Sequence, residues 1–437
     1  MLQLDRKLTL FGLTMIAVGS CIGSGIFVTP YEIVQAVPHH AFVLIVWSVG
    51  GVIALTGALT FAELGGMFPQ AGGVYVFLKE AYGELAGFLY GWVILLVINT
   101  GALAALGIAL AEYLSYFYPL DYRGKIILAI FVISGLTGIN LIGINTSQWF
   151  ANIFTGLKLL AIAGIIITGL VFFDPSKVQL NFNLAEGTPD NLGSALLLAL
   201  IGVLWSFGGW HHASYLAGEA VEPQRTVPRA MVFGALIVTA TYVLINLAYM
   251  LLLPLDAIAH TTRVAGEAVA QVVSFGGKLV AVAIAISIFG TIGIYTMSAP
   301  RIYFAMAKDG IFFEGLAFVH PRFHTPSNAM LLQAGWAILL LLFWGTFSEL
   351  ITYVTFMDIA FMALAGLSVF VFRRKRPEAE RPYRTWGYPA VPGIFVLISS
   401  AFVANTLVQR PVQALAGLAF LLLGIGAFYL FRSYHKP

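Results

Sequence analysis

Long runs of hydrophobic residues alternate with short polar segments along most of the chain. A helix crosses a hydrocarbon core of about 30 Å with about 20 apolar residues, and twelve runs come near or exceed that length. The third and eighth runs are long enough to tilt or to extend past the bilayer. We therefore expect an all-α membrane protein with twelve transmembrane helices, at 8–37, 41–66, 83–115, 124–141, 147–172, 193–219, 229–253, 268–306, 328–346, 348–372, 391–409 and 411–432.

Composition and charge agree with this pattern and add an orientation. Of the 437 residues, 59% are hydrophobic and only 10% are charged, whereas soluble domains carry roughly 25% charged residues. Of the 23 Lys and Arg, sixteen fall on the side that holds both termini, six fall on the other side, and Lys158 falls on neither. The positive-inside rule then predicts a multi-pass protein of the cell membrane (inner or plasma) with both termini cytoplasmic. The net charge of +3 gives no support for nucleic-acid binding.

The connections between the runs are short, with two exceptions. Residues 173–192 form a polar loop on the external side, and residues 373–390 form a basic, Pro-rich loop on the cytoplasmic side. We favour the second loop as a topology determinant near anionic headgroups over a regulatory site. Because no linker divides the chain, we expect a single transmembrane domain over residues 1–437.

Glycine-rich stretches interrupt the first and the sixth run. The first contains VGSCIGSGIF at 18–27, and the sixth contains WSFGGWHH at 205–212. Each Gly in a helix interior costs about 1 kcal/mol relative to Ala, although Gly also allows close helix packing in membranes. Interrupted segments at matching positions of two halves indicate a secondary transporter with inverted repeats. The repeats would be 8–172 and 193–372, followed by two further helices within 391–432.

The two interruptions also indicate a type of ligand. Irregular backbone at membrane depth is tolerated where it lines a cavity. The N–H groups at the start of a half-helix suit a carboxylate, because the helix end carries partial positive charge. Carbonyl groups freed at the end of a half-helix suit an ammonium. A site with both suits the zwitterionic part of an amino acid.

At these residues the sequence resembles the amino acid–polyamine–organocation (APC) superfamily, and most of all its L-amino acid transporter branch. Four stretches carry the resemblance, in order, over residues 8 to about 330. They are GSCIGSGIF in the first run, AELGGMFPQAGGVYVFLKEAYGELAGFLYGW at 62–92, GEAVEPQRTVPRA at 218–230 and AKDGIF at 307–312. The AGGVY block and the paired interruptions are the more specific features.

The resemblance implies a LeuT-type fold, with a five-plus-five inverted repeat, helices 1 and 6 unwound, and alternating access. It assigns the substrate carboxylate to backbone amides and the amino group to backbone carbonyls. It places one aromatic residue over the bound substrate and a further gating aromatic in the eighth span. The corresponding positions are Ser24, Gly25 and Ile26 for the amides, Ile22, Phe207 and Gly208 for the carbonyls, and Trp205 and Tyr295 for the aromatics.

His211 and His212 depart from the family pattern, which often reads GGWN there. A substrate contact and a satisfied histidine of the helix bundle are equally good interpretations of His211. Adjacent histidines point in different directions on a helix, and no other cluster has zinc-ligand spacing. We therefore expect no metal and no cofactor.

Two further ionisable residues lie within predicted spans. Lys158 is 11 residues from one end of the fifth span, about 16 Å of helix. A mid-membrane ammonium costs at least about 2.5–3.5 kcal/mol, which marks it as functional. The resemblance places Lys158 where sodium-coupled relatives hold a sodium ion. Lys158 would then be either a fixed cation in an exchanger, which we favour, or a titrating group in a proton symporter. Asp358 is equally a pathway carboxylate or a helix-bundle hydrogen-bonding group.

These observations predict a sodium-independent exchanger of neutral L-amino acids, with a proton-coupled symporter as the alternative. Neutral substrates are favoured because the interrupted segments hold no carboxylate for a cationic side chain. No GxSxG, HExxH or phosphate-loop motif supports an enzyme. The loop YPLDYRG between the third and fourth spans lacks Cys, so we expect no disulfide-linked subunit. We expect Glu63 to be structural and Glu219 to pair with an Arg or Lys at the inner side.

Overall fold

The computed structural model describes residues 3–184, 191–343, 347–409 and 411–434, and the regular structure in these residues is helical. A single isolated bridge in them joins Leu8 and Ala220. The elements are α1 (Leu10–Cys21), α2 (Gly25–Ala36), α3 (His40–Met67), α4 (Val74–Tyr82), α5 (Glu84–Val93), the π-helix η1 (Ile94–Ile98), α6 (Asn99–Leu114), α7 (Tyr122–Leu141), α8 (Ile144–Val171), α9 (Leu192–Phe207), α10 (His212–Tyr215), the 3₁₀ turn η2 (Ala217–Glu219), α11 (Pro223–Leu252), α12 (Leu255–His260), α13 (Val264–Ala270), α14 (Gly276–Ser298), α15 (Pro300–Lys308), the 3₁₀ turn η3 (Glu314–Ala317), α16 (Ser327–Phe343), α17 (Phe347–Lys375), α18 (Ala390–Gln409) and α19 (Pro411–Tyr434).

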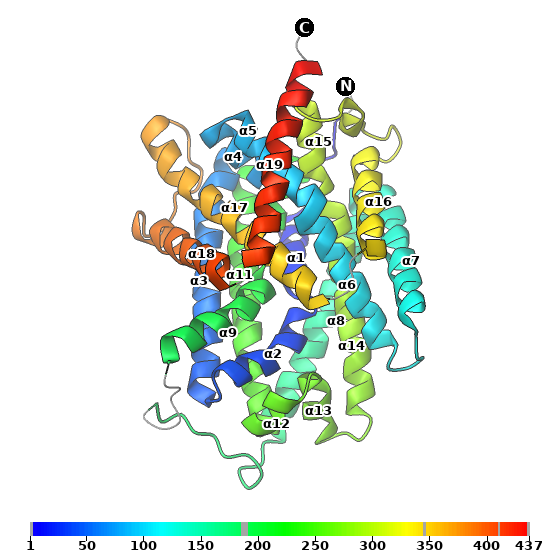
Figure 1. Ribbon diagram of the computed structural model, residues 1–437, viewed down its shortest axis with the longest axis vertical. Coiled ribbons are helices and arrows are strands. Elements are labelled where there is room, and N and C mark those ends of the chain that lie inside the picture. Colours follow the sequence, from blue (N-terminus) through cyan, green and yellow to red (C-terminus); the bar gives the residue numbers. More distant parts are fainter. Residues whose placement is uncertain (1–2, 185–190, 344–346, 410, 435–437) are drawn as a thin grey trace.

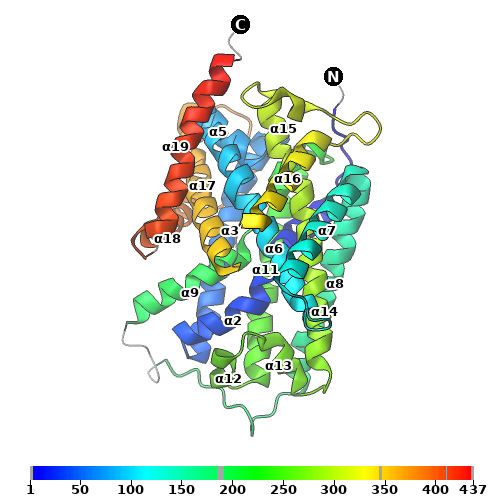
Figure 2. The same cartoon turned by 45° about the vertical axis from the view of Figure 1, so that its right-hand side comes forward.

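The helices form one elongated bundle, in which the segment before α1 and the end of α19 lie at the same end (Figure 1). The short helices α12 and α13 lie at the opposite end, as the turned view in Figure 2 also shows. Among the described residues, eight helices are long and apolar enough to cross a membrane, or nine if the bent pair α1 and α2 counts as one span. The chain is therefore a multi-pass membrane protein.

The prediction for the eighth span was wrong at its start. Residues 268–275 do not continue α14, because α13 ends at Ala270 and α14 begins only at Gly276. Gly276 lies against α13, where an added Cβ would be 2.7 Å from the carbonyl carbon of Val269. The apolar run hides this turn, since hydrophobicity alone does not separate a short external helix from the span that follows it.

Both predicted interruptions are present in the structure. Helix α1 ends at Cys21 and α2 begins at Gly25, with an angle of 43° between them. Helix α9 ends at Phe207, and α10 begins at His212 after a non-helical segment. Gly209 in that segment has φ +124°, a conformation that glycine adopts far more readily than other residues.

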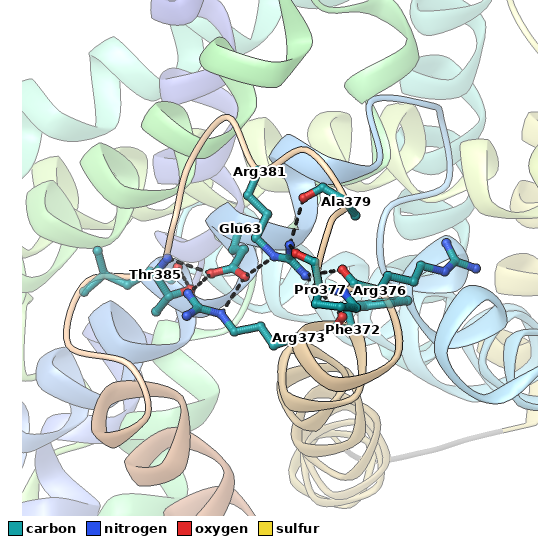
Figure 3. A network of polar contacts seen from close by, with 9 residues as sticks. Glu63, Phe372, Arg373, Arg376, Pro377, Ala379, Arg381 and Thr385 are labelled. Atoms are coloured by element: carbon teal, nitrogen blue, oxygen red, sulfur yellow. Dashed lines mark hydrogen bonds and ion pairs between the residues drawn. The ribbon is translucent and has the colours of Figure 1, made fainter.

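The basic loop after α17 is folded against the end of α3 (Figure 3). The buried Glu63 carboxylate accepts hydrogen bonds from Arg373 at 2.7 and 3.0 Å and from the Thr385 backbone N–H at 2.7 Å. The Arg381 guanidinium lies 3.2 Å from the same carboxylate. Arg381 also donates to four loop and helix carbonyls, those of Phe372, Arg376, Pro377 and Ala379.

We expect Glu63→Gln to destabilise the protein much more than Glu80→Gln. Loss of one partner from a buried ion pair costs about 3–5 kcal/mol. Glu80 also pairs with an arginine, Arg376 at 2.9 Å, but that pair is partly exposed and such pairs contribute about 0–1 kcal/mol. Thermal unfolding of both variants in detergent measures the difference. An equal fall in melting temperature for the two variants would contradict the role assigned to burial of the Glu63 pair.

We expect Gly209→Ala to lower the melting temperature and Gly208→Ala to lower it less. A Cβ at Gly209 would meet the Ser20 backbone at 2.7 Å in a left-handed conformation, and such strain costs about 1–3 kcal/mol. Gly208 has φ −62° and ψ 139°, which any residue adopts. Its Cβ would lie 3.3 Å from the nearest atom, the Trp205 carbonyl oxygen. Thermal unfolding in detergent measures both variants. A melting temperature that falls as far for Gly208→Ala as for Gly209→Ala would contradict the role of the left-handed backbone conformation at Gly209.

Candidate functional site

The two interrupted helices face each other across a cavity of about 100 Å³ in the middle of the bundle. Segments of α1, α2 and α9 form one part of its wall, and η1, α6, α14 and α17 form another. Parts of α3, α10 and α18 also line it. The predicted site residues that line this cavity are Ser24, Gly25, Trp205, Phe207, Gly208, His211, Tyr295 and Asp358.

Direct hydrogen bonds hold the two interruptions together. The Ser20 hydroxyl at the end of α1 donates to the Gly209 carbonyl at 2.8 Å. The buried Tyr242 hydroxyl of α11 lies 2.9 Å from the Cys21 carbonyl and 2.8 Å from the Ser206 carbonyl. The backbone carbonyls at the two interruptions therefore have hydrogen-bond partners within the protein, as an apolar environment requires.

The start of α2 presents backbone N–H groups at the cavity. The first helical hydrogen bonds of α2 are made by the N–H groups of Phe27 and Val28, both to the Ser24 carbonyl. The N–H groups before them have no place in the helical ladder, as at any helix start. Of the three residues predicted to offer amides, Ser24 and Gly25 line the cavity and Ile26 is not among its lining residues.

Lys158 of α8 lies beneath the interruption in α1. Its buried ammonium donates to the carbonyls of Gly19 and Ile22, at 3.0 and 2.6 Å, and to the Thr291 hydroxyl of α14 at 2.9 Å. No carboxylate forms an ion pair with it among the described residues. One cation thus joins α8, α1 and α14 through neutral oxygens.

One predicted substrate contact, the Ile22 carbonyl, lies outside the cavity. The Ile22 carbonyl, expected near a substrate amino group, is taken by Lys158 and also lies 3.0 Å from the Thr291 hydroxyl. Ile22 is not among the residues that line the cavity. The carbonyl therefore belongs to the support of the broken helix in this structure.

The rings of His211, His212 and Tyr295 lie close together beside the interruptions. The rings of Tyr295 and His212 stack at 4.4 Å, and the His212 Nδ1 lies 2.6 Å from the Ser298 hydroxyl. The His211 and His212 rings are 5.0 Å apart and tilted by 53°. In the part of the chain that the structure describes, no group of three or more His, Cys, Asp or Glu is placed to hold a metal ion.

Two polar groups in the cavity wall have no partner among the described residues. They are the Ser24 hydroxyl and the Asp358 Oδ1, both buried. The hydroxyls of Tyr90 and Tyr215, nearby, are hydrogen-bonded to each other at 2.5 Å. Buried polar atoms in proteins normally have a partner, so each such exception calls for an explanation.

The lining residues that were not singled out from the sequence include Asn99, Tyr215 and Thr291. Asn99 follows the π-helix η1, a type of irregularity that often marks functional sites. A polar amide in the middle of an apolar run is a signal that could have found Asn99. Tyr215 and Thr291 carry no comparable signal, because only packing brings them to the cavity.

Several contacts hold the helices together at the end of the bundle where both chain termini lie. Glu219 and Arg301, both fully buried, pair at 2.7 and 2.9 Å, as expected for Glu219. Backbone N–H groups of Lys7 and Leu8 donate to the Glu219 carbonyl at 2.8 Å. Asp5 joins this segment to His324 at 2.9 Å, and its hydrogen bond from Lys7 lowers the pKa of the Asp5 carboxyl.

The opposite end contains a second and larger cavity, of about 640 Å³, which we call the vestibule. Residues of α2, α6, α13 and α14 line it. Its charged residues are Glu112, Arg263, Glu267 and Lys278. Helices α2, α6 and α14 line both cavities, so the vestibule and the central cavity lie along the same three helices.

The comparisons with known proteins agree with this architecture. The amino acid permease family model matches residues 8–428. The chain is 33% identical over 430 residues to the serine/threonine exchanger SteT of Bacillus subtilis (strain 168), which covers 96% of this chain and 95% of that protein. It is 31% identical over 438 residues to the human b(0,+)-type amino acid transporter 1, covering 99% of this chain and 89% of that protein.

A mouse relative, the large neutral amino acids transporter small subunit 2, is 33% identical over 454 residues, covering 99% of this chain and 82% of that protein. The match to the family model spans nearly the whole chain and includes both interrupted helices. The chain therefore belongs to the amino acid permease family of the APC superfamily, with relatives of the L-amino acid transporter type, and it is an amino acid transporter rather than an enzyme.

Proposed function

We propose that the protein is a sodium-independent secondary transporter of neutral L-amino acids that works by exchange through alternating access. It would reside in the cell membrane with both termini in the cytoplasm. A proton-coupled amino acid symporter is the alternative. The printed functions of the relatives support the substrate class, since they include a serine/threonine exchanger and a transporter of large neutral amino acids.

The fold that goes with this function is a LeuT-type single domain with twelve transmembrane helices. Its inverted repeats are 8–172 and 193–372, and the last two helices lie within 391–432. The two interrupted helices support this proposal, because they belong to the first and the sixth of the predicted spans and line one cavity. Such helices are the best sequence pointer to the binding site of a secondary transporter.

In this proposal the amino acid binds between the two interruptions. The N–H groups of Ser24, Gly25 and Ile26 receive the carboxylate at the positive end of α2. Carbonyls at the end of α9, at Phe207 and Gly208, receive the amino group. Trp205 and Tyr295 close over the substrate, and His211 contacts its side chain.

The observation that carries sodium independence is the position of the Lys158 ammonium. Three oxygens from α1 and α14 surround it at 2.6–3.0 Å. Neutral oxygens contributed by two helices are also what a sodium ion would require. A side-chain cation held there supports the broken helix permanently and leaves the place unavailable to sodium.

Alternating access fits the unequal ends of the bundle. The buried Glu219–Arg301 pair and the segment before α1 close one end, whereas the vestibule hollows the other. Transport would require the closed end to open and the vestibule to close. The buried ion pair is suited to a switching contact, because its two members come from η2 and α15, which are distant in the sequence.

The proposed function is tested by uptake of labelled amino acids into proteoliposomes without sodium. Uptake should require unlabelled amino acid inside the vesicles and should be unaffected by an imposed pH gradient. Uptake into empty vesicles driven by a pH gradient would replace the exchanger with the symporter and make Lys158 or Asp358 the proton carrier. No uptake of any amino acid would refute the substrate class.

We expect Lys158→Met to reduce exchange by about tenfold or more at any pH between 6 and 9. The substitution leaves the carbonyls of Gly19 and Ile22 without their shared donor, and an unmet buried polar group costs about 1–3 kcal/mol. Lys125→Met is the matched control, because Lys125 forms its ion pair with the exposed Glu112. Full exchange by Lys158→Met would contradict the supporting role of the ammonium.

A further inference from the structure

We propose that Asp358 selects the side chain of the transported amino acid by accepting a hydrogen bond from a hydroxyl on a short side chain. This inference rests on the proposed function, because it assigns the substrate class of the same cavity. The preferred substrates would be small hydroxyl-bearing L-amino acids, of which serine is the simplest.

The first support is that Asp358, a residue of the cavity wall, carries an acceptor atom without a hydrogen-bond partner. Its Oδ1 has no hydrogen-bond partner among the described residues, and the residue lines the cavity. The neighbouring Tyr90 and Tyr215 hydroxyls are occupied with each other at 2.5 Å. A carboxyl group can accept a hydrogen bond whether or not it carries a proton.

The second support is the division of the cavity wall. The interruptions at Ser24–Gly25 and Phe207–Gly208 supply backbone groups for the carboxylate and amino group, as proposed above. The substrate side chain must then face the remaining wall, which includes η1, α6 and α17. Apart from Asp358, α17 contributes only the apolar Ile359 and Met362 to that wall.

The third support is size. The cavity measures about 100 Å³, and a water-sized group needs roughly 10–15 Å³ of such space. The cavity therefore holds fewer than about ten such groups, which suits a small amino acid.

The test compares L-serine with L-alanine, which differs only by the absent hydroxyl. Exchange kinetics in proteoliposomes should give a KM for serine about tenfold or more below that for alanine in the wild type, the difference expected for one hydrogen bond to a charged acceptor. Asp358→Asn keeps an acceptor oxygen and should retain part of the preference. Asp358→Leu should raise the KM for serine to that for alanine, and its size-exclusion profile and melting temperature in detergent show that the variant folds.

Asp256→Asn makes the same chemical change at an exposed carboxylate of α12 and should leave the serine preference intact. Equal KM values for serine and alanine in the wild type, or a full serine preference in Asp358→Leu, would overturn the inference.

Three results distinguish the failure of this inference from the failure of the proposed function. Wild-type protein that exchanges alanine and serine equally refutes the role of Asp358 while the proposed function stands. Wild-type protein that transports no amino acid refutes the proposed function and this inference with it. Uptake that is driven by a pH gradient in the wild type and lost in Asp358→Asn would make Asp358 a proton carrier and overturn its role in selection.

Discussion

Backbone groups released from a helix inside a membrane need polar partners within the protein, and this requirement governs the contacts around both interruptions. At the interruption in α1, the Lys158 ammonium takes the carbonyls of Gly19 and Ile22. The Tyr242 hydroxyl lies within hydrogen-bonding distance of the Cys21 and Ser206 carbonyls. The N–H groups at the start of α2, before Phe27, stay outside the helical hydrogen bonds, and Ser24 and Gly25 line the cavity.

The buried charges divide into two kinds by their partners. Glu219 with Arg301, and Glu63 with Arg373, form pairs at the end of the bundle that carries both chain ends. They hold helices that are far apart in the sequence. Lys158 and Asp358 lie at the level of the interruptions without an ion-pair partner among the described residues. The paired charges therefore stabilise one closed end, and the unpaired charges face the cavity or the backbone beside it.

Much of this arrangement could be predicted from residue type and spacing. Gly23 and Gly25, and Gly208 and Gly209, marked both interruptions because a run of such residues disfavours a helix. The prediction that Glu219 pairs with a basic residue is confirmed by Arg301. The start of the eighth span was predicted wrongly, because the turn before α14 lies inside an apolar run.

The amino-acid sequence was enough to predict a helical membrane protein, the places where its helices break and the family it resembles. These features follow from hydrophobicity, glycine content and local motifs, which act over a few residues. The packing of the helices brings the Ile22 carbonyl to the Lys158 ammonium and places Asp358, Asn99 and Thr291 around one cavity. The physical reason is that contacts between distant helices depend on how the helices pack, and the type of a residue alone does not say which partner or cavity its side chain meets.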